Sequence, residues 1–219
     1  ITVPTDEKII QRWEKLSDFV LKRNHLHIVE PKNRLAYLPL LKPFFDLVNV
    51  AYAPLYGTVD LTEQQIKKYS SKFAPLINPN TTCFVMDKND RMIAFGVGAP
   101  SLAVAMQKHR GRLFPTGWID VLKAFRKNDT VDLLLIAVHP DYQARGVNAV
   151  ILSKTMKGCL KMGIKQAETG PMLELNDKVQ SQWKDFQTEQ HKRRRCFVKE
   201  LTPAAGEPEK ADAPAGAAV

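Results

Sequence analysis

Residues 133–170 read LLLIAVHPDYQARGVNAVILSKTMKGCLKMGIKQAETG, and this stretch decides how we interpret the rest of the chain. The apolar run over 131–138 predicts a central strand that is buried on both faces of a sheet. A short turn then leads directly into a helix over 147–162, with Gly163 as its natural C-cap. Residues 165–170 predict another strand. The stretch is therefore a strand, a turn, a helix and a strand.

The turn between Pro140 and Ala149 has the chemistry of an anion site. The first N–H groups of a helix have no intrahelical partner, and the helix dipole adds partial positive charge there. Gly146 lets the backbone approach an anion closely, and Arg145 adds a fixed cation with a planar donor fork. A plain turn that joins a strand to a helix explains the same glycine, so the spacing alone leaves both interpretations open.

Periodicity and turn signals predict the remaining elements. The first helix starts at Thr5 or Asp6, and a Thr-x-x-Gln capping box at Thr62 and Gln65 starts a later one. The first predicted helix runs from Thr5 or Asp6 through Val20. The others are 39–53, 61–77, 101–109, 118–127 and 176–188, and Asn176 caps the last. The predicted strands outside the opening stretch are 26–31, the hairpin 81–87 with 91–100, and 194–201. This order predicts an α/β (α+β) domain with an antiparallel hairpin in its first half, and not a doubly wound sheet.

Composition excludes several classes of protein. Of 219 residues, 44% are hydrophobic and 25% are charged, which is ordinary for a folded chain. No apolar run is long enough to span a bilayer and no signal peptide opens the sequence, so we expect no membrane insertion. Three cysteines, Cys83, Cys159 and Cys196, are odd in number and far apart, which argues against a disulfide framework and a CxxC metal site. A reducing cytoplasm is the simplest location.

Charge and the two ends of the chain predict its organisation. Net charge is 32 − 23 = +9, and residues 143–200 hold 12 Lys/Arg against 6 Asp/Glu, which favours an anionic partner or a solvated basic surface. Residues 203–219 contain 12 Ala, Pro or Gly in 17 positions and predict a disordered tail. We therefore divide the chain into an N-terminal helix and linker (1–24), a folded domain (25–202) and that tail.

The opening stretch resembles the core of the GNAT (Gcn5-related) N-acyltransferase superfamily. The family signature is an apolar strand, then Gln/Arg-x-x-Gly-x-Gly/Ala, then a helix and a strand that ends near a carboxylate. Here residues 143–148 read QARGVN, so Asn148 stands where Gly or Ala is usual, with Ala149 one position later. The resemblance covers about residues 25–200 and implies a mixed, mostly antiparallel sheet flanked by helices.

Two further segments resemble a little-studied bacterial GNAT-like group. They are GRLFPTGW at 111–118 and HKRRRCFVKEL at 191–201. In that group the domain is commonly the C-terminal part of a longer chain, and the start at Ile1 is consistent with this.

The resemblance implies that the protein binds acetyl-CoA or another acyl-CoA as co-substrate. The pyrophosphate would lie on the backbone N–H groups of 144–149, beside the basic surface near Arg145 and Lys154. The pantetheine arm would pair with the central strand at Ile136 to Val138, where a β-bulge between the fourth and fifth strands opens the cleft. The implied cofactor-binding residues are Ile136, Ala137, Val138, Gln143, Ala144, Arg145, Gly146, Val147, Asn148, Ala149 and Asn176.

The implied reaction is acyl transfer to the amine of a small molecule or peptide. It needs a base, donors for the oxyanion and an acid for the leaving thiolate. Glu168 and Glu174 are the first candidates for the base and His139 is the third, although a solvated loop charge explains Glu174 and a strand-end position explains His139 equally well. A tyrosine commonly serves as the acid in this family, but the matching position holds Trp183, which we expect to shape the acceptor pocket. The amide near Val138 is the expected oxyanion donor.

Two other functions stay open at this stage. A GNAT-like module that binds a CoA thioester or a partner without turnover fits the missing tyrosine and Asn148. A basic nucleic-acid-binding domain is the second alternative, suggested by the run Lys192–Arg195. On a strand, alternation would divide that run between two faces, which argues against it.

Overall fold

The computed structural model describes residues 1–31, 34–55, 57–73, 77–174, 176–195, 197 and 199. The chain forms two units, Ile1–Glu189 and Gln190–Val219. In the second unit, the described residues adopt neither helix nor strand, so the strand predicted over 194–201 is absent at its described positions and the alternation argument for Lys192–Arg195 does not apply. The rest of that strand and the predicted tail lie outside the described residues.

A five-stranded sheet in the order β1-β2-β3-β4-β5 forms the centre of the first unit. From β1 to β4, each strand is antiparallel to the next, whereas β4 and β5 are parallel. The strands are β1 His27–Val29, β2 Thr82–Met86, β3 Met92–Pro100, β4 Thr130–Val138 and β5 Gln166–Thr169. This mixed, mostly antiparallel sheet confirms the predicted fold class.

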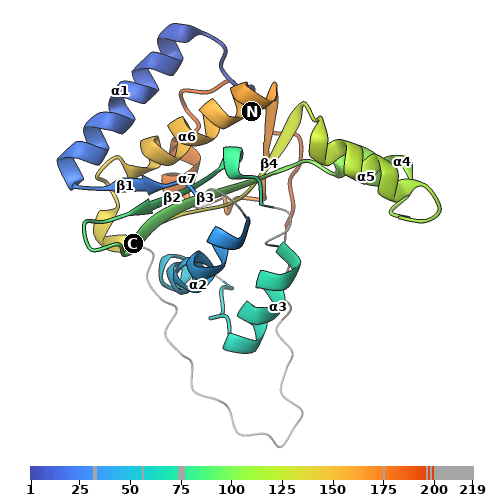
Figure 1. The fold of residues 1–219 in the computed structure, drawn as a ribbon, viewed down its shortest axis with the longest axis horizontal. Helices are drawn as coiled ribbons and strands as arrows, with labels where there is room; N and C mark the ends of the chain where they lie inside the picture. Colours follow the sequence, from blue (N-terminus) through green and yellow to red (C-terminus); the bar gives the residue numbers. More distant parts are fainter. Residues whose placement is uncertain are drawn as a thin grey trace, which may run out of the picture. The chain divides into compact units, whose positions relative to one another are not determined.

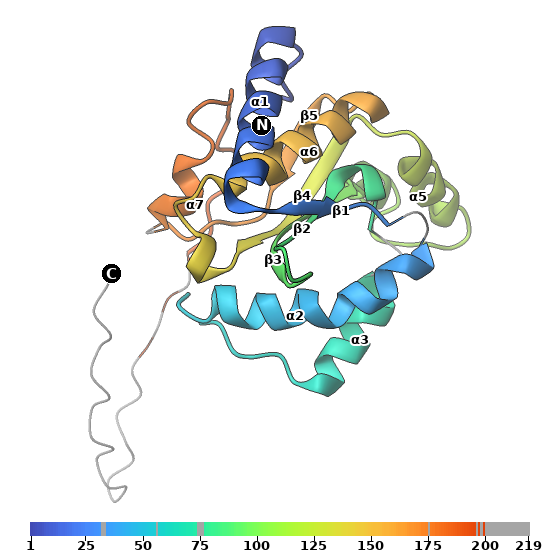
Figure 2. The same cartoon turned by 60° about the vertical axis from the view of Figure 1, so that its left-hand side comes forward.

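Helices cover both faces of this sheet (Figures 1 and 2). The α2 and α3 helices lie on one face, and α1 and α6 lie on the other. A helical hairpin of α4 and α5 connects β3 to β4. The helices are α1 Glu7–Asn24, α2 Leu38–Tyr52, α3 Glu63–Phe73, α4 Ala103–Lys108, α5 Gly117–Arg126, α6 Val147–Met162 and α7 Asp177–Ser181. Among the described residues, no helix has the length and apolar character needed to cross a membrane.

Local sequence signals account for where these helices begin and end. Asp6 caps α1 by accepting a hydrogen bond from the Lys8 amide at 2.8 Å. Thr62 and Gln65 form the predicted capping box, in which the Thr62 amide donates to Oε1 of Gln65 at 2.9 Å. Gly163 ends α6 in the left-handed conformation, with φ of 71°.

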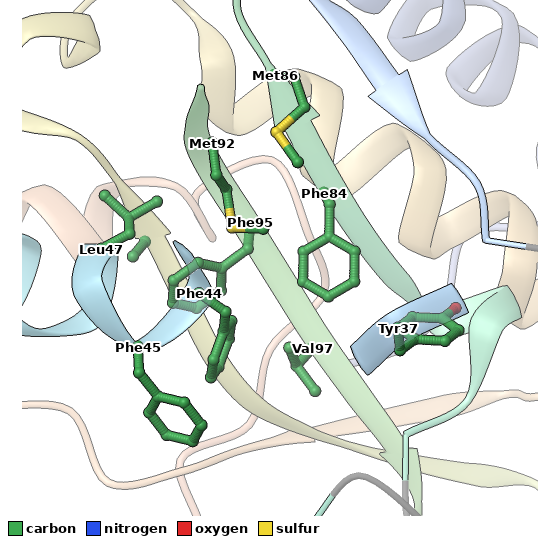
Figure 3. Packing of buried hydrophobic residues seen from close by; sticks show 10 residues of the cluster. Tyr37, Phe44, Phe45, Leu47, Phe84, Met86, Met92, Phe95 and Val97 are labelled. Carbon is green, nitrogen blue, oxygen red and sulfur yellow. The ribbon is translucent and has the colours of Figure 1, made fainter. Parts of the chain in front are cut away.

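Apolar clusters hold the helical layers against the sheet, one on the α2 face and two on the α6 face. On the α2 face, Phe44 packs on Phe95 with ring centroids 4.3 Å apart and on Phe84 at 6.3 Å (Figure 3). On the α6 face, Val150 and Ile151 pack with the buried strand residues of β2 and β3. The first helix belongs to this layer, because Val20 is buried in the same cluster.

Two predictions about burial and length are wrong. The central strand is not buried on both faces, since Leu134 and Leu135 are 45% and 39% exposed. Their exposure arises because β5 pairs with β4 only as far as Leu133. The helix predicted over 176–188 ends at Ser181, and i→i+3 turns replace it, such as Phe186 N to Trp183 O at 3.0 Å.

Gly158 generates a test of how closely α6 packs. A Cβ at this position would overlap the backbone carbonyl of Asn80, which cannot rotate away. We expect Gly158→Ala to lower the free energy of unfolding by about 1–3 kcal/mol. Gly170→Ala is the matched control, because a Cβ there meets no atom within 4 Å. Urea denaturation of both variants measures the difference, and equal stability of the two would contradict this packing.

Candidate active site

The second half of β4 has an open edge. Its pairing with β5 covers Thr130–Leu133, whereas its pairing with β3 continues to Val138. Among the described residues, no strand occupies the other edge of 134–138. Peptide groups that point to this edge therefore face no strand, and a ligand that pairs like a strand can bind those that no side chain occupies.

The hydrogen bonds of β4 show which peptide groups these are. The His139 amide donates to the carbonyl of Ile93 on β3 at 2.8 Å. In an antiparallel ladder, alternate residues bond to the same neighbour. The N–H and C=O groups of Ile136 and Val138 therefore point away from β3, towards the open edge. Consistent with this, the Val138 carbonyl accepts a hydrogen bond from Nε2 of Gln143 at 3.4 Å.

A β-bulge in the β3–β4 ladder lies at the point where β4 separates from β5. The register of β3 against β4 shifts between Val97 and Gly98, which leaves Leu134 as the extra residue. Leu133 packs with the α6-face cluster that contains Met156 and Cys159, whereas Ala137 belongs to the α2-face cluster. Strict alternation would place both on one face, so the bulge changes the face on which the later residues lie. The prediction placed this bulge between the fourth and fifth strands, but it lies in the β3–β4 ladder.

A tight turn follows the open edge and starts α6. Gly146 has φ of 80° and is the N-cap of α6, with no side-chain hydrogen bond to the helix start. Ala144 has φ of 58°, so two left-handed residues shape the turn. Val147 and Ala149 are buried, so they offer only backbone groups, whereas the others are exposed: Gln143, Ala144, Arg145, Gly146 and Asn148. The first amides of a long helix thus face an exposed loop.

Two arginines flank this turn. The Arg145 guanidinium lies 5.1 Å from the ring centroid of Tyr142, and Arg23 of α1 comes from the helix that packs against α6. Arg23, Asn24, Ala144 and Arg145 line one polar hollow. The sequence analysis missed Arg23, because only the packing of α1 brings it to the turn. Lys154, predicted to belong to this basic surface, instead forms an ion pair with Glu30.

The order of helices and strands is the one that the sequence resemblance implied. Two helices follow the first strand, a hairpin precedes the central strand, and a glycine turn joins that strand to a long helix. The parallel fifth strand leaves the central strand at an open edge. The chain has a GNAT-type fold.

Comparisons with known proteins give the following relatives. No family model matches the chain. Protein YghO of Escherichia coli K12 is 23% identical over 203 residues, which are 90% of this chain and 51% of that protein. The chain thus spans about half the length of the curated relative it matches.

Solved acetyltransferase structures are similar at 12–15% identity and TM-scores below 0.5. AAC(6')-Iy, in complex with the bisubstrate analog CoA-S-monomethyl-acetylneamine, has a TM-score of 0.49 and 12% identity, over 81% of this chain and 99% of that one. The Arabidopsis thaliana glucosamine-6-phosphate N-acetyltransferase scores 0.47 at 12% identity, over 79% and 99%. The Escherichia coli ribosomal-protein-S18-alanine N-acetyltransferase scores 0.45 at 15% identity, over 71% and 72%. At these scores, the assignment of the GNAT-type fold depends on the chain's own topology.

Tyr52 is a site residue that the sequence analysis missed. It ends α2, and its hydroxyl donates to the Ile136 carbonyl at 2.8 Å, across 84 positions of sequence. The phenol therefore lies at the open edge of β4, and burial raises its pKa. A tyrosine on an amphipathic helix predicts only core packing, so no sequence signal pointed to this contact.

Two carboxylates lie side by side below the open edge. Glu168 of β5 pairs in register with Asp132 of β4, and both are half-buried. Val131 and Ala167 pack with Met156 and Cys159 on the α6 face, so alternation places both carboxylates on the α2 face. The sequence analysis selected Glu168 and missed Asp132, because the pairing register is set by the tertiary fold. Glu174 is exposed in the segment between β5 and α7.

His139 has a structural environment at the end of β4. Its Nε2 lies 2.6 Å from Nη2 of Arg91, and its Nδ1 lies 3.4 Å from the Asp141 carboxylate. Because a guanidinium only donates, Nε2 accepts this bond and its lone pair is engaged. The ring is nearly buried, so the structure offers His139 less support as a base than Glu168.

Asn176 and Trp183 lie in and after α7. Asn176 caps the helix by accepting from the Val179 amide at 3.3 Å, which leaves its Nδ2 donor for other partners. The Trp183 indole donates to Sδ of Met172 at 3.3 Å. Trp183 also lines a small apolar cavity with Leu133, Leu152, Ala167 and Phe186. Its role as a substrate-pocket residue stays a prediction.

The two described cysteines pack in the core. Burial raises the pKa of Cys83 to about 12 and that of Cys159 to about 11. Both thiols are therefore protonated at neutral pH and are poor nucleophiles, as expected from the sequence. Cys196 lies outside the described residues.

Proposed function

We propose that the chain is a GNAT-family N-acyltransferase that moves an acyl group, most simply acetyl, from coenzyme A to an amine. The observation that carries this proposal is the continuity of two features. The open edge of β4 at Ile136 and Val138 leads within eight residues to the glycine turn and the uncapped start of α6. A ligand with an amide-containing arm and a pyrophosphate fits this sequence of groups.

The cofactor's phosphates belong at the turn. Helix-start amides within 144–149 donate to the pyrophosphate, and the helix dipole favours its charge. Arg145 and Arg23 supply cations on either side of the polar hollow. Gly146 has no Cβ, so an anion can approach the backbone closely.

The pantetheine arm belongs on the open edge. Its amides pair with the N–H groups of Ile136 and Val138 and with the Val138 carbonyl, while Ala137 between them bonds to β3. The Ile136 carbonyl already accepts a hydrogen bond from Tyr52. Gln143 must release the Val138 carbonyl for this pairing, and its exposed side chain is free to rotate. The Nδ2 donor of Asn176 is the predicted contact to the cofactor arm.

Chemistry takes place on the α2 face of this edge. Glu168, beside Asp132, is the first candidate to take the proton of the attacking amine, and the exposed Glu174 is the second. The amine nitrogen adds to the thioester carbon, and a β4 amide near Val138 stabilises the oxyanion that forms. When the C–S bond breaks, the thiolate takes a proton from Tyr52, which regains one from solvent. The proton lost by the amine passes to the carboxylate and then to solvent.

The same face has the features of an acceptor site. Leu134 and Leu135 expose apolar surface beside the two carboxylates, which attract an ammonium group. The loop after α2 is held in place there, because Leu61 exchanges hydrogen bonds with Asn49 at 3.0 and 3.3 Å. A small-molecule or peptide amine with an apolar body fits these surroundings.

A CoA-binding module without turnover is the second candidate function. Trp183 favours it, since an indole N–H is not a usable acid and this one already donates to Met172. Both candidates require cofactor binding, and only the first requires release of free thiol.

Cofactor binding tests both candidates. Coenzyme A at about 100 times its dissociation constant should stabilise the fold by roughly 2.7 kcal/mol. Gly146→Asp should abolish this shift, because its carboxylate would enter the turn and repel the phosphates. Gly111→Asp is the matched control, since Gly111 also has a positive φ, of 77°, and lies in the α4–α5 loop away from the turn.

The measurement is thermal denaturation of the three proteins with and without coenzyme A. A parent protein that shows no shift at millimolar coenzyme A would contradict the cofactor assignment. A shift that survives in Gly146→Asp would make the turn a structural feature only.

The assignment of Tyr52 as the acid generates a second test. Tyr52→Phe should lower the turnover number for acetyl-CoA by about 10²- to 10⁴-fold and leave the coenzyme A melting shift in place. Tyr37→Phe is the control, because Tyr37 is also buried, burial raises its pKa to about 12, and it packs in the α2-face core away from the open edge. Thiol release with a mixture of primary amines measures turnover. Equal turnover in Tyr52→Phe and the parent would remove Tyr52 from the mechanism.

A further inference from the structure

The α4–α5 hairpin is apolar on its outside. It projects from the sheet between β3 and β4, with its connecting loop farthest from the strands (Figures 1 and 2). Large apolar side chains are exposed on both helices and on the loop. They are Val104, Met106, Leu113, Phe114, Trp118, Ile119 and Leu122, and Phe114 is 79% exposed. A folded domain does not normally expose so many apolar side chains in one element unless they meet a partner.

The same hairpin is strongly basic. Residues 103–127 contain six Lys or Arg and one acidic residue, Asp120. Asp120 is already engaged, because Lys108 and His109 each lie 2.7 Å from its Oδ2, and these contacts hold its pKa well below the usual range. Within the described part of the chain, Arg110 and Arg112 at the loop have no carboxylate partner. The loop therefore presents unneutralised cations beside its apolar side chains.

Charge and side-chain type discriminate between partners. A second copy that paired through this hairpin would bring six cations against six cations, which is unfavourable. Single-stranded nucleic acid binds through stacking on aromatic rings, but five of the seven exposed side chains are aliphatic or Met. An anionic lipid surface accepts both features, since basic side chains pair with headgroup phosphates and apolar ones enter the acyl boundary.

The shape of the loop also favours a lipid surface. Leu113 and Phe114 lie on a projecting loop and not in a groove, and a bilayer requires no complementary shape. Trp118 is 45% exposed and its indole donates to the Pro115 carbonyl at 3.0 Å, which ties the loop to α5. Tryptophan is the side chain that membrane interfaces favour most, together with tyrosine.

We propose that the α4–α5 hairpin docks the protein on anionic membranes, with Leu113 and Phe114 in the acyl boundary and Arg110 and Arg112 on lipid phosphates. This is peripheral binding by one loop and requires no membrane-spanning helix. It does not depend on the proposed acyltransferase activity.

Vesicle sedimentation tests the docking. Vesicles of phosphatidylcholine with about one-third phosphatidylglycerol should bind the parent protein, and vesicles of phosphatidylcholine alone should bind it at least tenfold more weakly. Leu113→Ser with Phe114→Ser should reduce binding at least tenfold. Val59→Ser is the apolar control, because Val59 is 82% exposed in the loop between α2 and α3.

A charge-reversal pair separates local from overall charge. The double variant Arg110→Glu with Arg112→Glu should abolish binding to anionic vesicles. The control Lys67→Glu with Lys68→Glu, at exposed positions of α3, makes the same change in net charge and should keep most of the binding. Thermal denaturation of each variant verifies folding. Brominated lipid should quench the tryptophan fluorescence of the parent protein. It should not quench that of Trp118→Phe, which keeps only Trp13 and Trp183.

Three outcomes would overturn the proposal. One is absence of binding to the anionic vesicles, and another is equal binding to both vesicle types. The third is self-association of the protein that depends on its concentration and is lost in Phe114→Ser, with no binding to vesicles. That result would assign the hairpin to contact with a second copy of the chain. Binding that needs the loop but not the α3 lysines supports the proposal.

Discussion

After Leu133, β4 no longer pairs with β5, and the rest of the site depends on this constraint. A buried strand normally has its peptide groups paired on both edges. Here β3 satisfies one edge to Val138, and the bulge at Leu134 coincides with the loss of the other. The open edge leaves peptide groups for a ligand, exposes Leu134 and Leu135, and directs β4 towards the glycine turn.

The two faces of the sheet contribute differently to this site. The α6 face holds the proposed phosphate site, because Gly146 is the N-cap of α6 and the packing of α1 on α6 brings Arg23 to the same turn. The α2 face holds the groups to which we assign the chemistry, since Tyr52 donates to the Ile136 carbonyl and the carboxylates of Asp132 and Glu168 lie on the same face. A ligand on the open edge would thus be held from one face and approached from the other.

The sequence was sufficient for everything that is local. The helix over 147–162, its Gly163 cap and the Thr62 capping box follow from residues within one turn of each other, and the structure confirms them. The GNAT resemblance also predicted a mixed, mostly antiparallel sheet flanked by helices. Exposure of β4 was predicted wrongly, because an apolar run shows that a strand is hydrophobic and not how far its neighbour extends.

The site residues that sequence reasoning missed share one cause. Tyr52, Arg23 and Asp132 reach the site through packing between elements that are distant in the chain. Tyr52 and its partner Ile136 are 84 positions apart, and neither lies in a motif. Trp183 shows the opposite case. The resemblance located the position of the family's tyrosine acid, but that position holds an indole, which cannot serve as the acid.

Amide hydrogen exchange along β4, followed by NMR with and without coenzyme A, tests the central claim most directly. Without ligand, the amides of Ile136 and Val138 should exchange fast and that of Ala137 slowly, because only Ala137 bonds to β3. Coenzyme A should slow the exchange of Ile136, Val138 and the amides that start α6, and should leave Ala137 unchanged. Slow exchange of Ile136 and Val138 in the free protein, or no change on adding coenzyme A, would contradict an open edge that binds the cofactor.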